Sequence, residues 1–192
     1  MDSSDGQHWW FDSGSLALDF AYTGGLDSGN PAWEEFHTPD DLAQWLSDRF
    51  PEVAATAGAR ELIDATALRH AISRLARAAS RDAQLPADDV DTLNLFAATP
   101  DIPPVLSGGS RQAGRTKARP TQALSTIARD AVRLFGAETE GRIRECSADD
   151  CTIVYLDTSR SGNRRWCSMQ RCGNRAKVRA HRARASDGAT SL

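Results

Sequence analysis

Hydrophobic residues recur at the three- and four-residue spacing of an amphipathic helix in four stretches of the chain. These stretches are residues 39–50, 59–81, 86–99 and 121–135. The last shows the clearest pattern, and Gly136 follows it as a stop signal. The first has a start signal, because Thr38 can cap a helix and Pro39 suits the first helical position. The pattern therefore predicts a body built mainly of α-helices.

Two other stretches lack this periodicity and are expected to be irregular. Residues 1–38 contain two turn signals, Gly24-Gly25 and the segment 27–31. Residues 101–120 contain paired prolines and paired glycines, which are typical of a linker. We therefore expect the first regular element near residue 39 and a break between the third and fourth helices.

A short β-prone run, Thr152–Leu156, lies in the last quarter of the chain. The turn-forming residues 157–163 follow it, and Arg164–Trp166 suits a return strand, so a hairpin is predicted. Two such strands are not stable alone and need an anchor. The predicted fold is mainly α, with a helical domain at residues 1–140. A small module at 141–192 would follow, made of a β-hairpin and a C-terminal helix.

Charge is unevenly distributed between these two parts. The whole chain of 192 residues has a net charge of -3. From Cys146 onward, nine arginines and lysines face four aspartates, so this part carries +5 and the remainder carries −8. A basic module on an acidic body indicates an anionic partner, with nucleic acid as the first candidate, although a solvated basic tail has the same composition.

Membrane and secretory signals are absent from the sequence pattern. No apolar run approaches the roughly 18–20 residues that a membrane span needs. The N-terminal residues are acidic and lack the basic and apolar regions of a signal peptide. We therefore expect a cytoplasmic protein without a membrane partner.

All four cysteines lie in the basic module, at the spacing C-x4-C-x15-C-x4-C. They are Cys146, Cys151, Cys167 and Cys172. Two short cysteine knuckles separated by a hairpin can place four thiolates at the corners of a tetrahedron, which predicts one Zn²⁺ ion. Four protein ligands leave no open position for a catalytic water, so the ion would be structural. Disulfides are the main alternative, disfavoured in a reducing cytoplasm, and a redox dithiol would favour C-x-x-C.

The module resembles the CGNR zinc-finger family. The resemblance rests on Cys172-Gly173-Asn174-Arg175, on the preceding segments 156–160 and 164–169, and on the basic segment 175–182. In that family the finger follows a helical N-terminal domain called the ABATE domain. The body is similar to this domain through Phe11, Gly14 and residues 16–20. The resemblance implies a stress-related bacterial transcription regulator.

A basic helix is expected from Arg175 to about Ala185. Arg175, Arg179 and Arg182 would share one face, and Lys177, His181 and Arg184 an adjacent one. A helix with so few large apolar residues buries little in its own protein, so we expect it to bind the phosphates of DNA. The predicted DNA-binding residues are Arg164, Arg165, Arg171, Arg175, Lys177, Arg179, Arg182 and Arg184. The alternatives are a solvated helix, an RNA-binding module, or a zinc-stapled module that docks an acidic protein.

Some aromatic and acidic side chains allow two interpretations. Trp166 could stack on a base, but a tryptophan beside a zinc ligand is more often part of a small core. Asp157 is expected to pair with Arg164, Arg165 or Arg175 and so to fix the hairpin. The body aromatics could line a small-molecule effector pocket or simply form the core; they are Trp9, Trp10, Phe20, Tyr22, Trp33 and Trp45.

No constellation for catalysis is recognisable. The four histidines are scattered, no cysteine lies outside the predicted metal set, and the chain lacks a glycine-rich phosphate loop and a G-x-S-x-G motif. We therefore do not expect an enzyme. The body is expected to sense an effector or to form a homodimer, which would double the DNA contact of one small finger.

Overall fold

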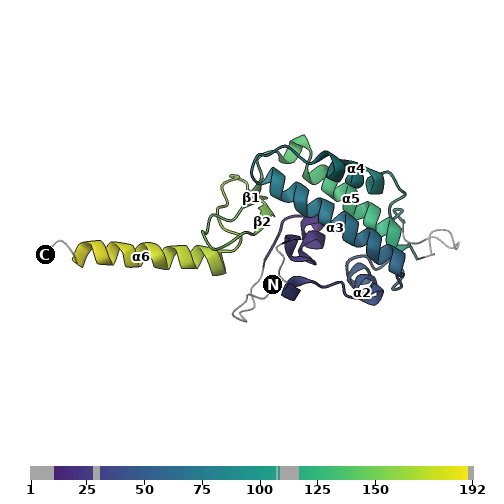
Figure 1. Ribbon diagram of the computed structural model, residues 1–192, viewed down its shortest axis with the longest axis horizontal. Coiled ribbons are helices and arrows are strands. Elements are labelled where there is room, and N and C mark those ends of the chain that lie inside the picture. The colour runs from purple at the N-terminus through teal and green to yellow at the C-terminus, as the bar shows by residue number, and fades with distance from the viewer. Residues whose placement is uncertain (1–10, 28–30, 107, 109–116, 190–192) are drawn as a thin grey trace.

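The computed structural model describes residues 11–27, 31–106, 108 and 117–189, without the side chains of 183 and 185–189. Six α-helices and a two-stranded antiparallel sheet make up most of its regular structure, with a few short 3-10 and π-helical segments (Figure 1). The helices are α1 (Leu16–Tyr22), α2 (Pro39–Arg49), α3 (Ala59–Ala79), α4 (Ala87–Ala97), α5 (Pro120–Leu134) and α6 (Asn174–Ala189). The strands are β1 (Ile143–Glu145) and β2 (Val154–Leu156). No helix in the described ranges is long and apolar enough to cross a membrane.

The four predicted body helices are confirmed as α2, α3, α4 and α5. The α2 start is a capping box: Thr38 Oγ1 accepts a bond from the Asp41 amide at 3.3 Å, and the Asp41 carboxylate accepts one from the Thr38 amide at 2.7 Å. Along α5, the predicted apolar face is buried, with Leu124 and Ile127 fully enclosed. The body is therefore a layered bundle in which α3, α4 and α5 pack side by side (Figure 1).

The prediction that residues 1–38 are irregular is wrong at α1. This seven-residue helix begins after Ser15, whose hydroxyl accepts a bond from the Ala17 amide at 3.2 Å. Leu18 and Phe20 are fully buried, and α1 packs against α3 and α5. A helix this short is unstable alone and shows little periodicity, so its conformation depends on the packing around it.

The core interpretation holds for Phe20 and Tyr22, which are buried, and for Trp45, which packs against the core, whereas Trp33 is half-buried and is not in the described core cluster. The rings of Phe20, Phe36 and Trp45 form a cluster with centroid distances of 5.4–6.3 Å. Edge-on contacts of this kind are typical of a hydrophobic core. Trp9 and Trp10 lie outside the described residues.

The hairpin differs from the prediction in its second strand. Strand β2 falls within the β-prone run, but its partner is β1, which precedes the first cysteine; Ile143 pairs with Leu156 and Glu145 with Val154. Residues 164–166 are irregular. The Arg164 amide donates to the Asp157 carboxylate at 2.8 Å instead of to a strand, which explains why the predicted return strand does not form.

The finger is joined to the body by hydrogen bonds and by a shared core. The Tyr22 hydroxyl, at the end of α1, donates to the Val154 carbonyl at 2.7 Å and accepts from the Val154 amide at 2.8 Å. The Leu156 amide donates to the Ser13 carbonyl at 2.8 Å. Between these, Gly14 has a φ of +81°, and a Cβ there would lie 2.7 Å from the Leu156 carbonyl oxygen, so the junction requires glycine.

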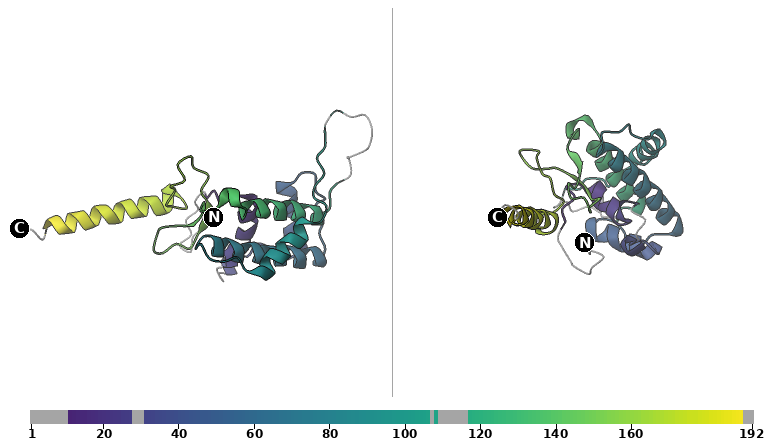
Figure 2. Two further views of the ribbon diagram at one scale, coloured as in Figure 1. Left: turned by 90° about the horizontal axis from the view of Figure 1, so that it is seen from above. Right: turned by 60° about the vertical axis from the view of Figure 1, so that its left-hand side comes forward.

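Helix α6 extends away from everything else. In Figure 1 and in the left view of Figure 2 it leaves the finger as a single rod, on the side of the finger that faces away from the helical body. The structure thus presents a compact body, a finger docked on it, and a basic helix that projects into solvent.

Candidate zinc centre and basic helix

The four cysteines lie together, as the spacing predicts. Their sulfur atoms are all within 4.8 Å of one another, and three of the four residues are buried. The Cys151–Cys167 and Cys167–Cys172 sulfur distances are 3.7 and 3.6 Å, far longer than a disulfide, and all four thiols are free. A tetrahedron with Zn–S bonds of 2.3 Å has edges of about 3.8 Å. The sulfur positions therefore fit one zinc ion.

Three of the four cysteines are held by local backbone structure. Cys146 follows β1, and its amide donates to the Ile153 carbonyl at 2.8 Å. Cys151 closes a tight turn, in which its amide donates to the Ala148 carbonyl at 2.9 Å. Cys172 lies in η4 (Met169–Gly173), a short π-helical segment that runs directly into α6. Cys172, the fourth predicted zinc ligand, thus lies directly before the basic helix.

The thiols influence one another strongly. Hydrogen bonds from Cys151 and Cys167 lower the pKa of Cys146 to about 2. The same bonds raise the pKa of Cys151 to about 12, and raise that of Cys167 as well. A cation bound among these sulfurs would stabilise their thiolate forms, because each negative charge otherwise opposes the next.

Two donors point at these sulfur atoms from the surrounding chain. The Cys167 amide lies 3.4 Å from the Cys146 sulfur, and Arg175 Nη2 lies 3.2 Å from the Cys172 sulfur. The bond with Cys172 raises the pKa of Arg175. A zinc ion with four thiolates carries a formal charge of about −2, which these donors would partly offset.

The glycine and asparagine between Cys172 and Arg175 also have structural roles. A Cβ on Gly173 would lie 2.7 Å from the Met169 sulfur and 3.3 Å from a ring carbon of Trp166. Trp166 is half-buried against the core, which supports its interpretation as a core residue. Asn174 donates to the Gln170 carbonyl at 3.2 Å, across the passage from η4 to α6.

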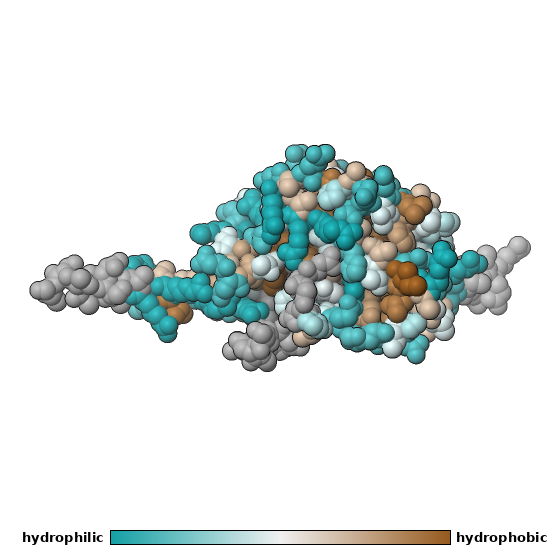
Figure 3. Space-filling model, viewed as in Figure 1, coloured by the Kyte–Doolittle hydropathy of each residue, from teal (hydrophilic) through white to brown (hydrophobic). Residues whose placement is uncertain are grey.

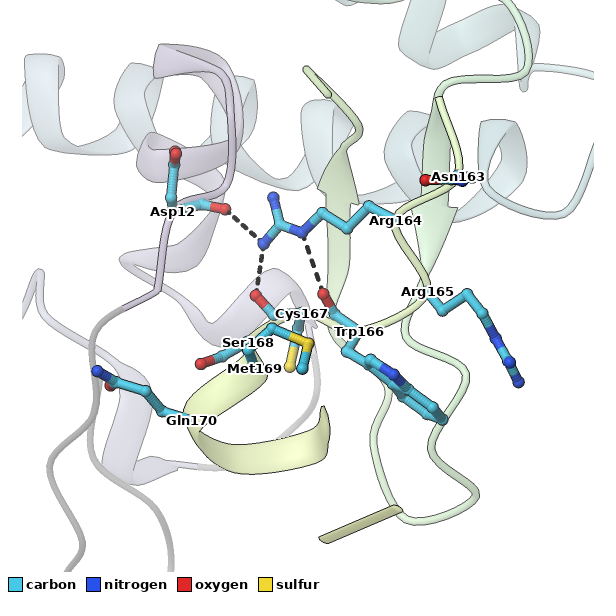
Figure 4. A pocket seen from close by; sticks show the side chains of 9 residues that line it. All are labelled: Asp12, Asn163, Arg164, Arg165, Trp166, Cys167, Ser168, Met169 and Gln170. Atoms are coloured by element: carbon cyan, nitrogen blue, oxygen red, sulfur yellow. Dashed lines mark hydrogen bonds between the residues drawn. The ribbon is translucent and has the colours of Figure 1, made fainter. Parts of the chain in front are cut away.

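Arg164 is turned into the finger rather than out to solvent. Its guanidinium donates to the carbonyl oxygens of Trp166, Cys167 and Asp12 (Figure 4). It also lies 4.2 Å from the centre of the Tyr155 ring. A pocket of about 580 Å³ lies beside it, lined by Asp12 and residues 163–170 (Figure 4). Arg164, predicted to bind DNA, therefore links the second knuckle to the N-terminal segment.

Asp157 fixes the hairpin by a different route from the one predicted. Its fully buried carboxylate accepts bonds from the Ser159 amide and hydroxyl at 3.0 and 2.6 Å and from the Arg164 amide. Burial raises its pKa, but these bonds outweigh that effect and leave the pKa below its usual value. Backbone and hydroxyl donors take the place of the expected guanidinium partner.

Two arginines of the predicted DNA-binding face contact the finger. Arg175 donates to Asp150 at 2.9 Å, and Arg179 donates to the same carboxylate at 3.2 Å. Asp149 lies 3.7 Å from Arg179. Sequence reasoning missed this acidic pair, although two aspartates in the first knuckle of an otherwise basic module are a recognisable signal.

The other predicted cations are arranged around the rest of α6. Lys177 and Arg182 are exposed and form no hydrogen bond or ion pair within the described part of the chain. Arg184 donates to the Ala180 carbonyl at 3.2 Å. Arg165 is exposed, with its guanidinium 5.1 Å from the centre of the Trp166 ring, and Arg171 is half-buried at the base of the helix.

Comparison with known families places both parts of the chain. The model described as "CGNR zinc finger" matches residues 142–185. The ABATE model, described as "Putative stress-induced transcription regulator", matches residues 14–138. No curated protein matches the chain. The matches confirm the resemblance found in the sequence, and neither description is that of an enzyme. The ABATE model matches more than half of the chain's length. The chain therefore belongs to the ABATE family, and a CGNR zinc finger follows its ABATE domain.

Proposed function

We propose that this protein is a DNA-binding transcription regulator whose zinc finger orients α6 toward duplex DNA. Cys146, Cys151, Cys167 and Cys172 would hold one structural Zn²⁺. The observation that carries the proposal is the position of α6: the finger holds its first turn, and the remainder projects away from the body (Figure 2). A helix that extends from a compact anchor fits a major groove.

The charge of α6 supports a polyanionic partner. No acidic residue occurs between Ser159 and Ala185 in the sequence. Within α6, Arg175 and Arg179 are partly neutralised by the aspartates of the finger, whereas Lys177, Arg182 and Arg184 have no acidic partner in the described structure. We therefore assign the phosphate contacts chiefly to these three residues, with Arg165 and Arg171 near the base of the helix. Arg164 and Arg175 would act by positioning the finger and the helix.

Binding to nucleic acid across a salt series tests this proposal. Zinc-loaded protein should bind random duplex DNA with an affinity that falls steeply with salt. Replacing Lys177 and Arg182 together by Ala should weaken binding and reduce the slope of log affinity against log salt by about 2. The matched control removes Arg60 and Arg133, two exposed arginines of the body, and should leave the slope unchanged.

Two results of the same experiment would favour other functions. Preferential binding to single-stranded RNA would indicate an RNA-binding module. Binding to an acidic protein without any preference for nucleic acid would indicate a protein-docking module. An unchanged DNA affinity after loss of Lys177 and Arg182 would contradict the role given to α6.

We propose a regulatory role for the body, with the domains divided at residues 140 and 141. The family matches, which end at 138 and begin again at 142, support this division. A small-molecule effector or a homodimer interface would act on the finger through the Tyr22–Val154 bonds. Light scattering with and without duplex DNA distinguishes a dimer from a monomer. The proposed location is the cytoplasm.

A further inference from the structure

One face of α6 is exposed and has no charged side chain at its centre. Asn174, Val178 and His181 are spaced i, i+4 and i+7, so they form a single stripe along the helix. All three are exposed, and Val178 is 49% exposed. In Figure 3 the described part of α6 is largely hydrophilic but is interrupted by a small hydrophobic patch.

The stripe lies next to the side of α6 that contacts the finger. Arg175 and Arg179 mark that side, because both bind Asp150. Successive residues are rotated by about 100° around a helix, so Val178 lies about 60° from Arg175 and His181 about 120° from it. A shallow groove of about 360 Å³ is lined by Asn174 and Val178 together with Arg175, Arg179 and Arg182. The stripe is therefore open to a partner that approaches from solvent.

Cations lie on both sides of the stripe. By the same helical rotation, Arg182 lies between the stripe and Arg175, whereas Lys177 and Arg184 lie on the stripe's other side. The arrangement is an uncharged centre with an amide, an isopropyl group and an imidazole, bordered by positive charge on each side. Like charges at the borders oppose the pairing of this face with a second copy of α6.

This pattern matches the major groove of B-DNA. The groove is about 12 Å wide and admits an α-helix, with phosphates along both edges and base edges at its floor. A thymine presents a methyl group there, and an adenine presents a donor and an acceptor that suit an amide. The major groove of A-form RNA is too narrow and deep for a helix, so double-stranded RNA fits less well.

We propose that the stripe Asn174–Val178–His181 reads base edges, with Val178 in contact with a thymine methyl group. Lys177, Arg182 and Arg184 then hold the two phosphate backbones. The proposal rests on the proposed function and adds sequence readout to it. Contact with a thymine methyl group would bury the exposed side chain of Val178 between the cations that border the stripe.

The test removes the proposed contact once by changing the protein and once by changing the DNA. Zinc-loaded protein first selects its preferred duplex from a random DNA library. Val178→Ala should then weaken binding to this duplex about fivefold, while binding to random duplex and the salt slope stay unchanged. Replacing the contacted thymine by deoxyuridine should cause a similar loss for the wild-type protein. Because both changes remove one contact, their combination should cost little more than either alone.

The controls separate this inference from the proposed function. Val132→Ala removes an exposed valine from α5 and should leave affinity for the selected duplex unchanged. Zinc content and circular dichroism of Val178→Ala should match the wild type. Equal losses on selected and random duplexes, or additive losses from Val178→Ala and deoxyuridine, would overturn the base contact and leave DNA binding intact. Failure to bind any duplex would instead overturn the proposed function.

Discussion

The body and the finger are stabilised by different means. The body encloses a continuous apolar interior, in which Leu18, Leu68 and Leu124 are fully buried. The finger has two strands of three residues each, and its buried groups include three of the four cysteines. Burial of apolar area can fold the body. The finger has too few buried apolar residues of its own to fold by apolar burial alone, so we expect it to depend on the zinc ion that its cysteines can hold. One chain would then combine a metal-independent body with a metal-dependent finger.

Removing zinc should produce the largest effect and should act on the finger alone. Chelation of the zinc-loaded protein, or Cys167→Ser, should abolish metal binding and unfold the finger, because zinc supplies about 10–16 kcal/mol to small zinc-finger domains. Elemental analysis should show the loss of about one equivalent of zinc. Amide NMR signals from residues 141–182 should collapse while those of α3, α4 and α5 remain dispersed.

The control for this experiment lies in the same finger. Ser161→Ala changes an exposed residue and should keep the zinc and the finger signals. Retention of zinc by Cys167→Ser would refute the ligand set. Simultaneous unfolding of the body would refute the distinction between the two regions.

A core truncation in the body should give the opposite result. Leu124→Ala removes a fully buried side chain from α5 and should lower the free energy of unfolding of the body by about 2–5 kcal/mol. Zinc content at room temperature should remain about one equivalent. Urea unfolding followed by circular dichroism measures the change, with Val132→Ala, which is 42% exposed in the wild type, as the control with little effect. Zinc loss in Leu124→Ala would show that the finger depends on the body more than its contacts indicate.

The smallest effect is expected at the junction. Tyr22→Phe deletes both bonds to Val154 and should cost about 1–3 kcal/mol, because it leaves buried polar groups of β2 without their partner. Hydrogen exchange should become faster in β2 and at the end of α1 together. Tyr155→Phe is the matched variant, since its hydroxyl donates to the Arg164 carbonyl inside the finger. If both variants accelerate hydrogen exchange only in the finger, the junction does not couple the finger to the body.

Sequence reasoning succeeds where a local pattern determines the outcome. The α5 periodicity, the Thr38 cap and the cysteine spacing each depend on neighbouring residues, and each is found in the structure as predicted. Sequence reasoning fails where contacts with distant residues determine the secondary structure. The α1 helix is stabilised by packing against α3 and α5, and β1 is a strand because it pairs with β2 across the first knuckle.

The functional assignment of arginines has the same limit. Composition identifies α6 as basic, but it does not distinguish Arg175, which contacts a sulfur, from Arg182, which is free of such contacts. The three-residue separation of Cys172 and Arg175 places them one turn apart, which is a local signal for that contact. The inward rotation of Arg164 depends in part on the carbonyl of Asp12, which is 152 residues away, and that contact has no such signal.

The double contact of Arg175 has a mechanical consequence for the distal end of α6. The guanidinium joins the Cys172 sulfur and Asp150 at the root of a helix of 16 residues, which is about 24 Å long. A tilt of about 10° at this root would displace the far end by about 4 Å, more than the length of a hydrogen bond. A small rearrangement around one sulfur atom is thus sufficient to move the far end of α6 out of register with the DNA proposed as its target.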